Sequence, residues 1–164
     1  MNYAELLNDV KSRIRQAQTK AALAVNAEML MLYWDIGRII NLRQDEEGWG
    51  SGIIPRLATD IRNELPELKG FSERNLKRML AFYREYGTLS FVPQPVAPLV
   101  AYIHSGLVPQ PVAQFEQIQK LYDLAFQLPW GHNIILIEKV KDLAARLWYM
   151  EQTVNGGWSR DTLD

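Results

Sequence analysis

The chain has 164 residues, no cysteine, and 18 basic against 19 acidic side chains, for a net charge of −1. This length predicts a single domain, and a composition of 48% hydrophobic and 23% charged residues excludes a disordered or low-complexity chain. The missing cysteines exclude disulfide scaffolds, cysteine zinc sites and thiol nucleophiles, and the near-neutral charge argues against a polybasic coat for nucleic acid.

The N-terminal residues show neither a signal peptide nor a membrane span. Charged residues such as Glu5, Asp9 and Lys11 interrupt the apolar positions of this segment. No apolar run in the chain approaches the ~18 residues that a membrane helix needs. We therefore expect a soluble cytoplasmic protein without a membrane partner.

Residues 1–43 carry a heptad pattern, and no Gly or Pro occurs before Gly37. Apolar residues fall at Tyr3, Leu7, Val10, Ile14 and Ala17, and they resume out of phase at Ala22, Val25, Met29, Leu32, Ile36 and Ile39. The pattern predicts either one long helix with a skip or a hairpin of two helices, the second capped by Thr19. A long helix cannot bury such a stripe within so small a domain, so the pattern also indicates a homodimer formed through residues 1–43.

A helix–turn–helix-like unit is predicted for residues 53–86, after a turn at residues 45–50. The first helix begins at Ile53, tolerates Pro55 in its first turn, and is closed by Pro66. A short turn contains Gly70, Ser72 caps the second helix, and Gly87 ends it.

A proline-rich loop is predicted for residues 88–114, which contain five of the eight prolines. The string Val-Pro-Gln-Pro-Val-Ala occurs twice, at 92–97 and 108–113. Proline at every second residue blocks helices and central strands, so we expect an extended, partly polyproline II conformation. A local duplication explains the repeat, and a proline-rich ligand for a partner protein is the alternative.

The C-terminal residues are again predicted to be helical, at 115–128 and 142–154. A turn at 129–133 and a short apolar segment at 134–140 separate the two helices, and residues 155–157 end the second. Residues 158–164 look like the start of a linker helix to a downstream domain. Together these elements predict one all-α domain over residues 1–164.

The five tryptophans are interpreted as large side chains that fill helix–helix junctions, with base stacking as the alternative. They are Trp34, Trp49, Trp130, Trp148 and Trp158.

Catalytic signatures are missing from the sequence. The two histidines, His104 and His132, have no metal-binding spacing, and we expect the ring of His132 to satisfy a backbone group. No GxSxG elbow, Walker A string or GxGxxG loop is present. The carboxylates of residues 45–47 cluster only in a predicted turn. We therefore expect no catalytic residue, no metal site and no cofactor, and we do not expect this chain to be an enzyme.

A basic strip on the second helix of the 53–86 unit is the best functional candidate. On a helical wheel of residues 74–86, apolar side chains occupy one arc, and the opposite arc carries Arg74, Lys77, Arg78 and Arg84 with Asn75 at its edge. This arrangement is typical of a recognition helix, although Glu73 and Glu85 bracket the strip. A solvated surface and a protein contact are the alternatives.

Several motifs occur in a fixed order: residues 25–28 (VNAE), 33–37 (YWDIG), 49–50 (WG), 70–76 (GFSERNL), 82–83 (FY), 130–133 (WGHN) and 157–160 (GWSR). This series resembles the N-terminal domain of the YhcG-type family of bacterial proteins. The resemblance covers residues 1–87 and 128–164. The proline-rich segment 88–114 is not matched, because the equivalent connection in the family is variable, and Leu80 stands where a second basic residue is expected.

The resemblance implies an all-α module of unknown function that precedes a PD-(D/E)xK nuclease domain and has a DNA-binding role beside it. No nuclease residue can be assigned to this chain. We therefore expect a non-catalytic DNA-binding module that uses Arg74, Asn75, Lys77, Arg78 and Arg84. The rival function is an oligomerisation module that positions a nuclease domain, and an adaptor that binds only protein is a third.

Overall fold

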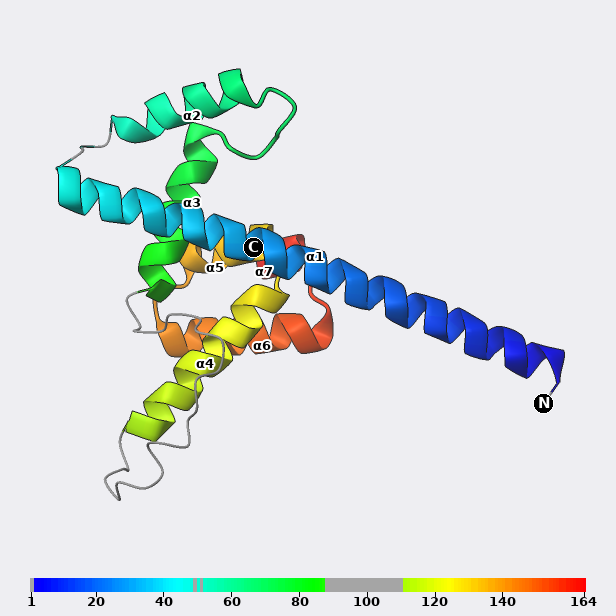
Figure 1. Ribbon diagram of the computed structural model, residues 1–164. Helices are drawn as coiled ribbons and strands as arrows, with labels where there is room; N and C mark the ends of the chain where they lie inside the picture. Colours follow the sequence, from blue (N-terminus) through cyan, green and yellow to red (C-terminus); the bar gives the residue numbers. More distant parts are fainter. Residues whose placement is uncertain (1, 49, 51, 88–110) are drawn as a thin grey trace, which may run out of the picture.

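The computed structural model describes residues 2–48, 50, 52–87 and 111–164, and all regular structure within these ranges is helical. The protein is therefore all-α, as the sequence predicted. The helices are α1 (Tyr3–Glu47), α2 (Ile53–Glu64), α3 (Glu73–Gly87), α4 (Pro111–Gln127), α5 (Trp130–Lys139), α6 (Leu143–Gly156) and α7 (Arg160–Leu163), shown in Figure 1. Within these ranges no helix combines the length and the hydropathy that crossing a bilayer requires.

Helix α1 is a single helix of 45 residues, about 67 Å long at 1.5 Å per residue. It begins at a capping box, in which the side chains of Asn2 and Glu5 each accept the other residue's backbone N–H at 2.9 Å. It ends at Gly48, whose φ of 62° is left-handed. Of the two predicted arrangements, the single long helix is therefore correct and the hairpin is wrong, and Thr19 lies inside the helix because no Gly or Pro interrupts it there. The turn expected from residue 45 starts only at Gly48.

The C-terminal half of α1 packs against the other helices, whereas residues 2–25 are all exposed. Figure 1 shows this N-terminal half extending away from the rest of the molecule. The second predicted stripe is also largely exposed, with Val25 at 71% and Leu32 at 49%. The buried residues lie on a neighbouring face of the helix, because the body packs on its aromatic side chains and its glycine. They are Leu30, Tyr33, Trp34, Gly37 and Ile40.

Helix α3 crosses α1 at Gly37. A Cβ atom at this position would lie 2.2 Å from the carbonyl oxygen of Met79 and 2.9 Å from the Cβ of Tyr83, so only glycine permits the approach. Beside the crossing, the rings of Trp34 and Tyr83 pack edge to face with centroids 5.0 Å apart. This crossing fixes the position of α3, and with it the predicted basic strip, relative to α1.

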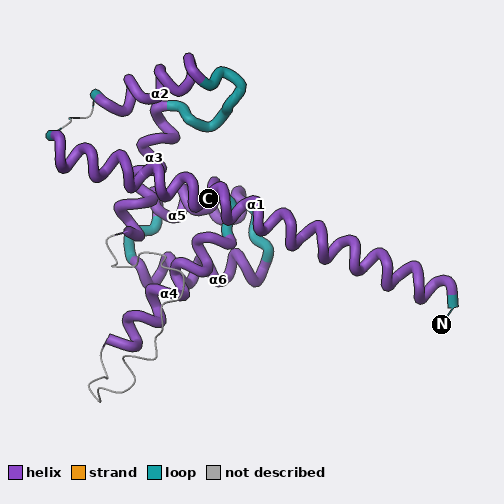
Figure 2. The backbone as a smooth tube through the Cα atoms, in the orientation of Figure 1, coloured by secondary structure: helices purple, strands orange, loops and turns teal. Residues whose placement is uncertain are grey.

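The predicted bounds of the helices in the 53–86 unit agree with the structure. Pro55 lies in the first turn of α2, and the backbone N–H of Asn75 donates to Ser72 Oγ at 3.4 Å at the start of α3. The connecting loop, shown in Figure 2, runs from residue 65 to residue 72 and includes Gly70 at a φ of 93°. It is longer than the 3–4-residue turn that is usual in a DNA-binding helix–turn–helix.

Two predictions for the C-terminal part are wrong. Helix α4 begins at Pro111, so residues 111–114 are helical, whereas residues 88–110, with most of the proline-rich segment and its repeat, lie outside the described residues. The predicted turn and apolar segment at 129–140 form one helix, α5, with Pro129 as its N-cap. The buried amide of Asn133, which suggested a turn, donates instead to the carbonyl oxygen of Ala125 at 2.8 Å.

The predicted starts of the last two helices are correct. The Asp142 carboxylate accepts the backbone N–H of Ala145 at 2.7 Å, and Ser159 Oγ accepts that of Thr162 at 3.2 Å. Helix α6 is followed by Gly157, whose φ of 62° is left-handed.

Two of the tryptophans fill helix junctions, as predicted. Trp34 is 7% exposed, and Trp130 packs on Tyr33 and Phe82 with ring centroids 4.9 and 5.4 Å apart. Trp148 is 51% exposed, so the interpretation is wrong there. Trp158 is half-buried against Trp148, and Trp49 lies outside the described residues.

Candidate nucleic-acid interface

The helical-wheel prediction for α3 assigns the buried side correctly. Leu76, Met79, Leu80 and Phe82 are each at most 6% exposed and pack toward α1, α2 and α5. Leu80, which stands in place of an expected basic residue, is therefore part of the core. The opposite side of α3 carries the predicted cations, and Arg74, Lys77 and Arg84 are exposed there.

Arg74 and Lys77 lie near the N-terminal end of this exposed face. Lys77 Nζ pairs with the Glu73 carboxylate at 2.6 Å, one turn earlier on the same helix. Exposed pairs of this kind contribute about 0.3–0.5 kcal/mol, so Lys77 can exchange its carboxylate for another anion at little cost. Within the described ranges, no hydrogen bond or ion pair is seen for Arg74.

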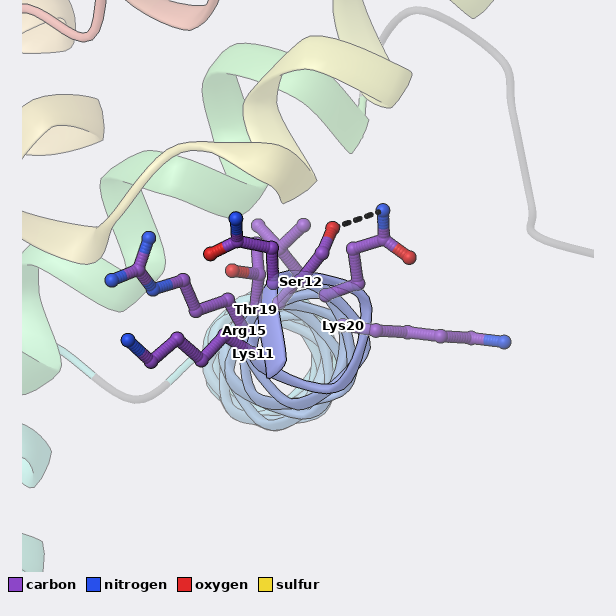
Figure 3. A pocket seen from close by; sticks show the side chains of 8 residues that line it. Lys11, Ser12, Arg15, Thr19 and Lys20 are labelled. Atoms are coloured by element: carbon purple, nitrogen blue, oxygen red, sulfur yellow. Dashed lines mark hydrogen bonds between the residues drawn. The ribbon is translucent and has the colours of Figure 1, made fainter. Parts of the chain in front are cut away.

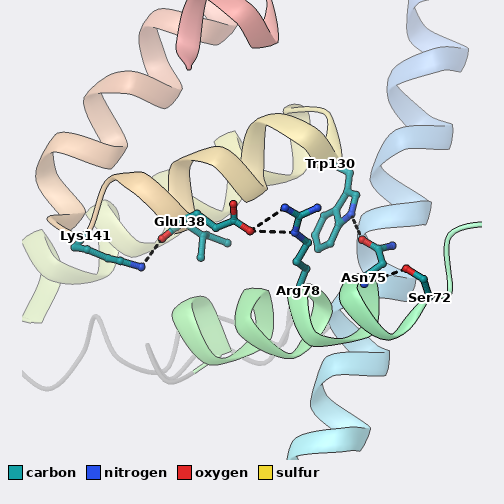
Figure 4. Close-up of polar contacts among 7 residues, drawn as sticks. Ser72, Asn75, Arg78, Trp130, Glu138 and Lys141 are labelled. Carbon is teal, nitrogen blue, oxygen red and sulfur yellow. Dashed lines mark hydrogen bonds and ion pairs between the residues drawn. The ribbon is translucent and has the colours of Figure 1, made fainter. Parts of the chain in front are cut away.

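Arg78 and Arg84 are held by other helices. Figure 4 shows Arg78 reaching from α3 to Glu138 on α5, where the ion pair is 3.0 Å long and the Arg78 side chain is 25% exposed. Arg84 donates to the side-chain oxygens of Asn41 at 2.7 Å and Gln44 at 3.1 Å, both on α1. Both guanidinium groups therefore have fixed positions at the edges of the α3 face.

Asn75 is placed differently from the four cations. Its side-chain amide donates to the Gly70 carbonyl oxygen, and its Oδ1 accepts the indole N–H of Trp130 at 2.8 Å (Figure 4). These bonds connect the α2–α3 loop with α5. The structure thus brings Arg74, Lys77, Arg78 and Arg84 together on one face and turns Asn75 toward the interior.

A second cationic surface, which was not among the predicted sites, lies on the projecting half of α1. Residues 10–27 contain Lys11, Arg13, Arg15 and Lys20 and no carboxylate. Viewed along α1 in Figure 3, Lys11 and Arg15 extend to one side and Lys20 to the other. This run of cations without Asp or Glu can be read from the sequence and could have predicted the surface. The same residues also carry the heptad pattern, which predicted a helix–helix contact instead.

The described residues include no cluster of three or more side chains that could hold a metal ion. His132 Nε2 lies 3.0 Å from the carbonyl oxygen of Trp158, so its ring satisfies a backbone group as predicted. His104 lies outside the described residues.

Comparison with known proteins adds the evolutionary context. The family model described as "DUF1016 N-terminal domain" matches residues 9–164. A protein of Escherichia coli (strain K12) described as "Putative nuclease YhcG" is 29% identical over 167 residues, which cover 96% of this chain and 42% of the relative. The chain thus spans less than half the length of this curated relative. No solved structure matches the chain.

Proposed function

The chain belongs to the DUF1016 N-terminal domain family, and we propose that it is a non-catalytic DNA-binding module of a nuclease-type bacterial protein. In this proposal the exposed face of α3 contacts the DNA, and a downstream nuclease domain cuts it. The description of the relative as a nuclease, and the 42% of its length that this chain spans, support a separate catalytic domain.

The observation that carries the proposal is the set of four cations on the outer face of α3. Arg74 and Lys77 contact phosphates directly, and Arg78 and Arg84 define the edges of the contact. Asn75 would have to break its bond with Trp130 to reach a base, so its role here is to hold the loop. With three or four phosphate contacts, we expect the slope of log affinity against log salt to be about −3.

A charge-reversal pair tests this surface. Lys77→Glu combined with Arg78→Glu should weaken binding to a fluorescent 30-bp duplex at least tenfold at 50 mM salt, while the far-UV circular dichroism is retained. Lys11→Glu with Arg15→Glu is the matched control, because it makes the same change in net charge on α1. Equal affinity of the α3 variant and the parent at low salt would sink the assignment. An equal loss in both variants would show that α3 is not the distinct contact surface, because overall charge or the cations of α1 would then contribute as much.

The second candidate function is an oligomerisation module that positions the nuclease domain. The exposed N-terminal half of α1, with large apolar side chains such as Tyr3 and Ile14 at 78% and 53% exposure, favours it. Analytical ultracentrifugation should then show a dimer, and a clean monomer at high micromolar concentration would count decisively against it. An adaptor that binds only protein would give neither a DNA complex nor self-association.

A further inference from the structure

The N-terminal half of α1 presents an apolar stripe that no described residue covers. Its members follow one another in alternating steps of four and three, and they are Tyr3, Leu7, Val10, Ile14, Ala17, Ala21 and Ala24. At 100° per residue, the stripe lies on the opposite side of α1 from the body-facing residues Asn26, Tyr33 and Gly37. A second helix can therefore cover the stripe from Tyr3 to Ala21 on the side that faces away from the described body. Only Ala24, at the end of the stripe, lines a hollow beside α4, with Tyr122 and Phe126.

The stripe is divided by size, with large side chains up to Ile14 and alanines from Ala17 onward. In an antiparallel pair of α1 helices whose facing residue numbers sum to 31, Leu7 lies opposite Ala24 of the second copy. Val10 then faces Ala21, and Ile14 faces Ala17. Each large side chain meets a small one, so the helices stay evenly spaced. A parallel pair would place large residues opposite large and alanine opposite alanine, which spaces the helices unevenly.

We propose that two copies of this chain associate through antiparallel pairing of residues 3–28 of α1. This proposal rests on the second candidate function and defines its partner and geometry. The 3.5-residue average period of the stripe favours such a two-helix seam.

The ends of the seam agree with the fold. Near its C-terminal end, the Asn26 side chain donates to the carbonyl oxygens of Phe126 at 3.4 Å and Leu128 at 3.1 Å, where α1 first meets α4. The seam thus occupies the segment that projects from the body. With Leu6 and Val25 at its margins, it buries roughly 600 Å² per copy at about 60–120 Å² per large side chain. Since a standard interface buries about 800 Å² per partner, we expect a dissociation constant in the micromolar range.

The charges beside the seam predict an unusual salt response. Lys11, Arg13 and Lys20 flank the stripe. The antiparallel register brings Arg13, which Asp9 compensates only in part through an exposed ion pair of 3.1 Å, near Lys20 of the second copy. Added salt screens this repulsion and leaves the apolar contact intact. Self-association should therefore tighten with ionic strength, whereas DNA binding weakens, so the two proposals can fail separately.

Introduced cysteines test the register, because the natural chain contains none. The double variant Leu7→Cys/Ala24→Cys should form a covalent dimer in a glutathione redox buffer, and either single variant should not. In the antiparallel pair the two Leu7 positions lie about 26 Å apart, far beyond disulfide reach. A parallel in-register pair would instead cross-link each single variant to itself, which would overturn the proposal.

Sedimentation of a disrupted seam gives the second measurement. Ile14→Glu should raise the dissociation constant at least tenfold, while Ser12→Glu, the same charge on the polar side of α1, should leave it within twofold. Ser12 and Ile14 are both exposed in the projecting part of α1, so both variants should keep a folded body. A dimer without the predicted cross-links overturns the antiparallel register alone. A monomeric parent overturns the register together with the oligomerisation function.

Discussion

Replacing Gly37 by alanine should destabilise the protein, although alanine is normally the better helix former by about 1 kcal/mol. Gly37 lies where α1 and α3 cross, and an added Cβ would come within 2.2 Å of the Met79 carbonyl oxygen. Carbon–oxygen contacts between helices are usually about 3.3–3.6 Å, so the two backbones would have to separate by about 1 Å. Because the clash is with backbone, no change of side-chain rotamer relieves it.

The expected change in the free energy of unfolding for Gly37→Ala is the difference between two opposing effects. Overpacking of a well-packed contact costs about 1–3 kcal/mol, and a backbone clash belongs at the upper end. The separation also loosens the Trp34–Tyr83 ring contact and the bonds from Arg84 to α1. After the gain in helix propensity is subtracted, we expect the free energy of unfolding to fall by about 2 kcal/mol, a drop in Tm of about 4–8 °C.

Gly131→Ala is the matched control, because Gly131 is also helical but its added Cβ would meet only the flexible Arg160 side chain, whose Cδ is nearest at 3.6 Å. We expect this variant to be neutral or more stable by up to about 1 kcal/mol. Urea unfolding followed by circular dichroism measures both changes. A Gly37→Ala variant as stable as the parent would refute the close approach of α1 and α3.

Two further predictions concern buried polar groups. Glu85→Ala removes the ion-pair partner of the fully buried Arg146, 3.0 Å away. Because this leaves a buried charge unpaired, the free energy of unfolding measured in urea should fall by about 2 kcal/mol. Adding Arg146→Met to this variant should restore part of the lost stability. Burial raises the pKa of both Tyr86 and Tyr122 to about 12. An unfolded tyrosine has a pKa near 10, so the folded protein keeps these two hydroxyls protonated at a higher pH than the unfolded chain does. Their contribution to the free energy of unfolding is therefore complete below pH 10 and is lost as the pH rises through 12. Absorbance at 295 nm should show part of the tyrosine ionisation delayed to about pH 12, and complete ionisation of all seven tyrosines near pH 10 in the folded protein would contradict this.

Helix ends were predictable where the capping group is local in sequence. Ser72, Asp142 and Ser159 accept N–H groups three residues ahead, so short motifs were enough to place these starts. The start of α5 was missed because Gly131 and Asn133 resemble turn residues. Asn133 is instead buried against carbonyl oxygens of α4, a contact that no local pattern reveals.

The basic strip on α3 also combines features that the local sequence predicts with contacts from distant residues that it does not. The wheel of α3 predicted which side is buried, because that depends on periodicity alone. It could not predict that Glu138, 60 residues away, pairs with Arg78, or that Asn41 and Gln44 hold Arg84. The sequence also could not decide whether residues 1–43 form one helix or a hairpin. The same apolar pattern fits both arrangements as long as the surface that covers it is unknown.

The two proposals together set how a dimer meets DNA. The cations of α3 lie on the side opposite its contact with α1, and the stripe lies on the far side of α1 from that contact. In the antiparallel pair the two cationic faces therefore point away from each other, about 65 Å apart along the shared axis at 1.5 Å per residue. One straight duplex can reach only one of these faces, so each copy should bind its own duplex. The parent and Ile14→Glu should therefore show the same preference for 30 bp over 12 bp. A stronger preference in the parent would show that both faces act on one duplex.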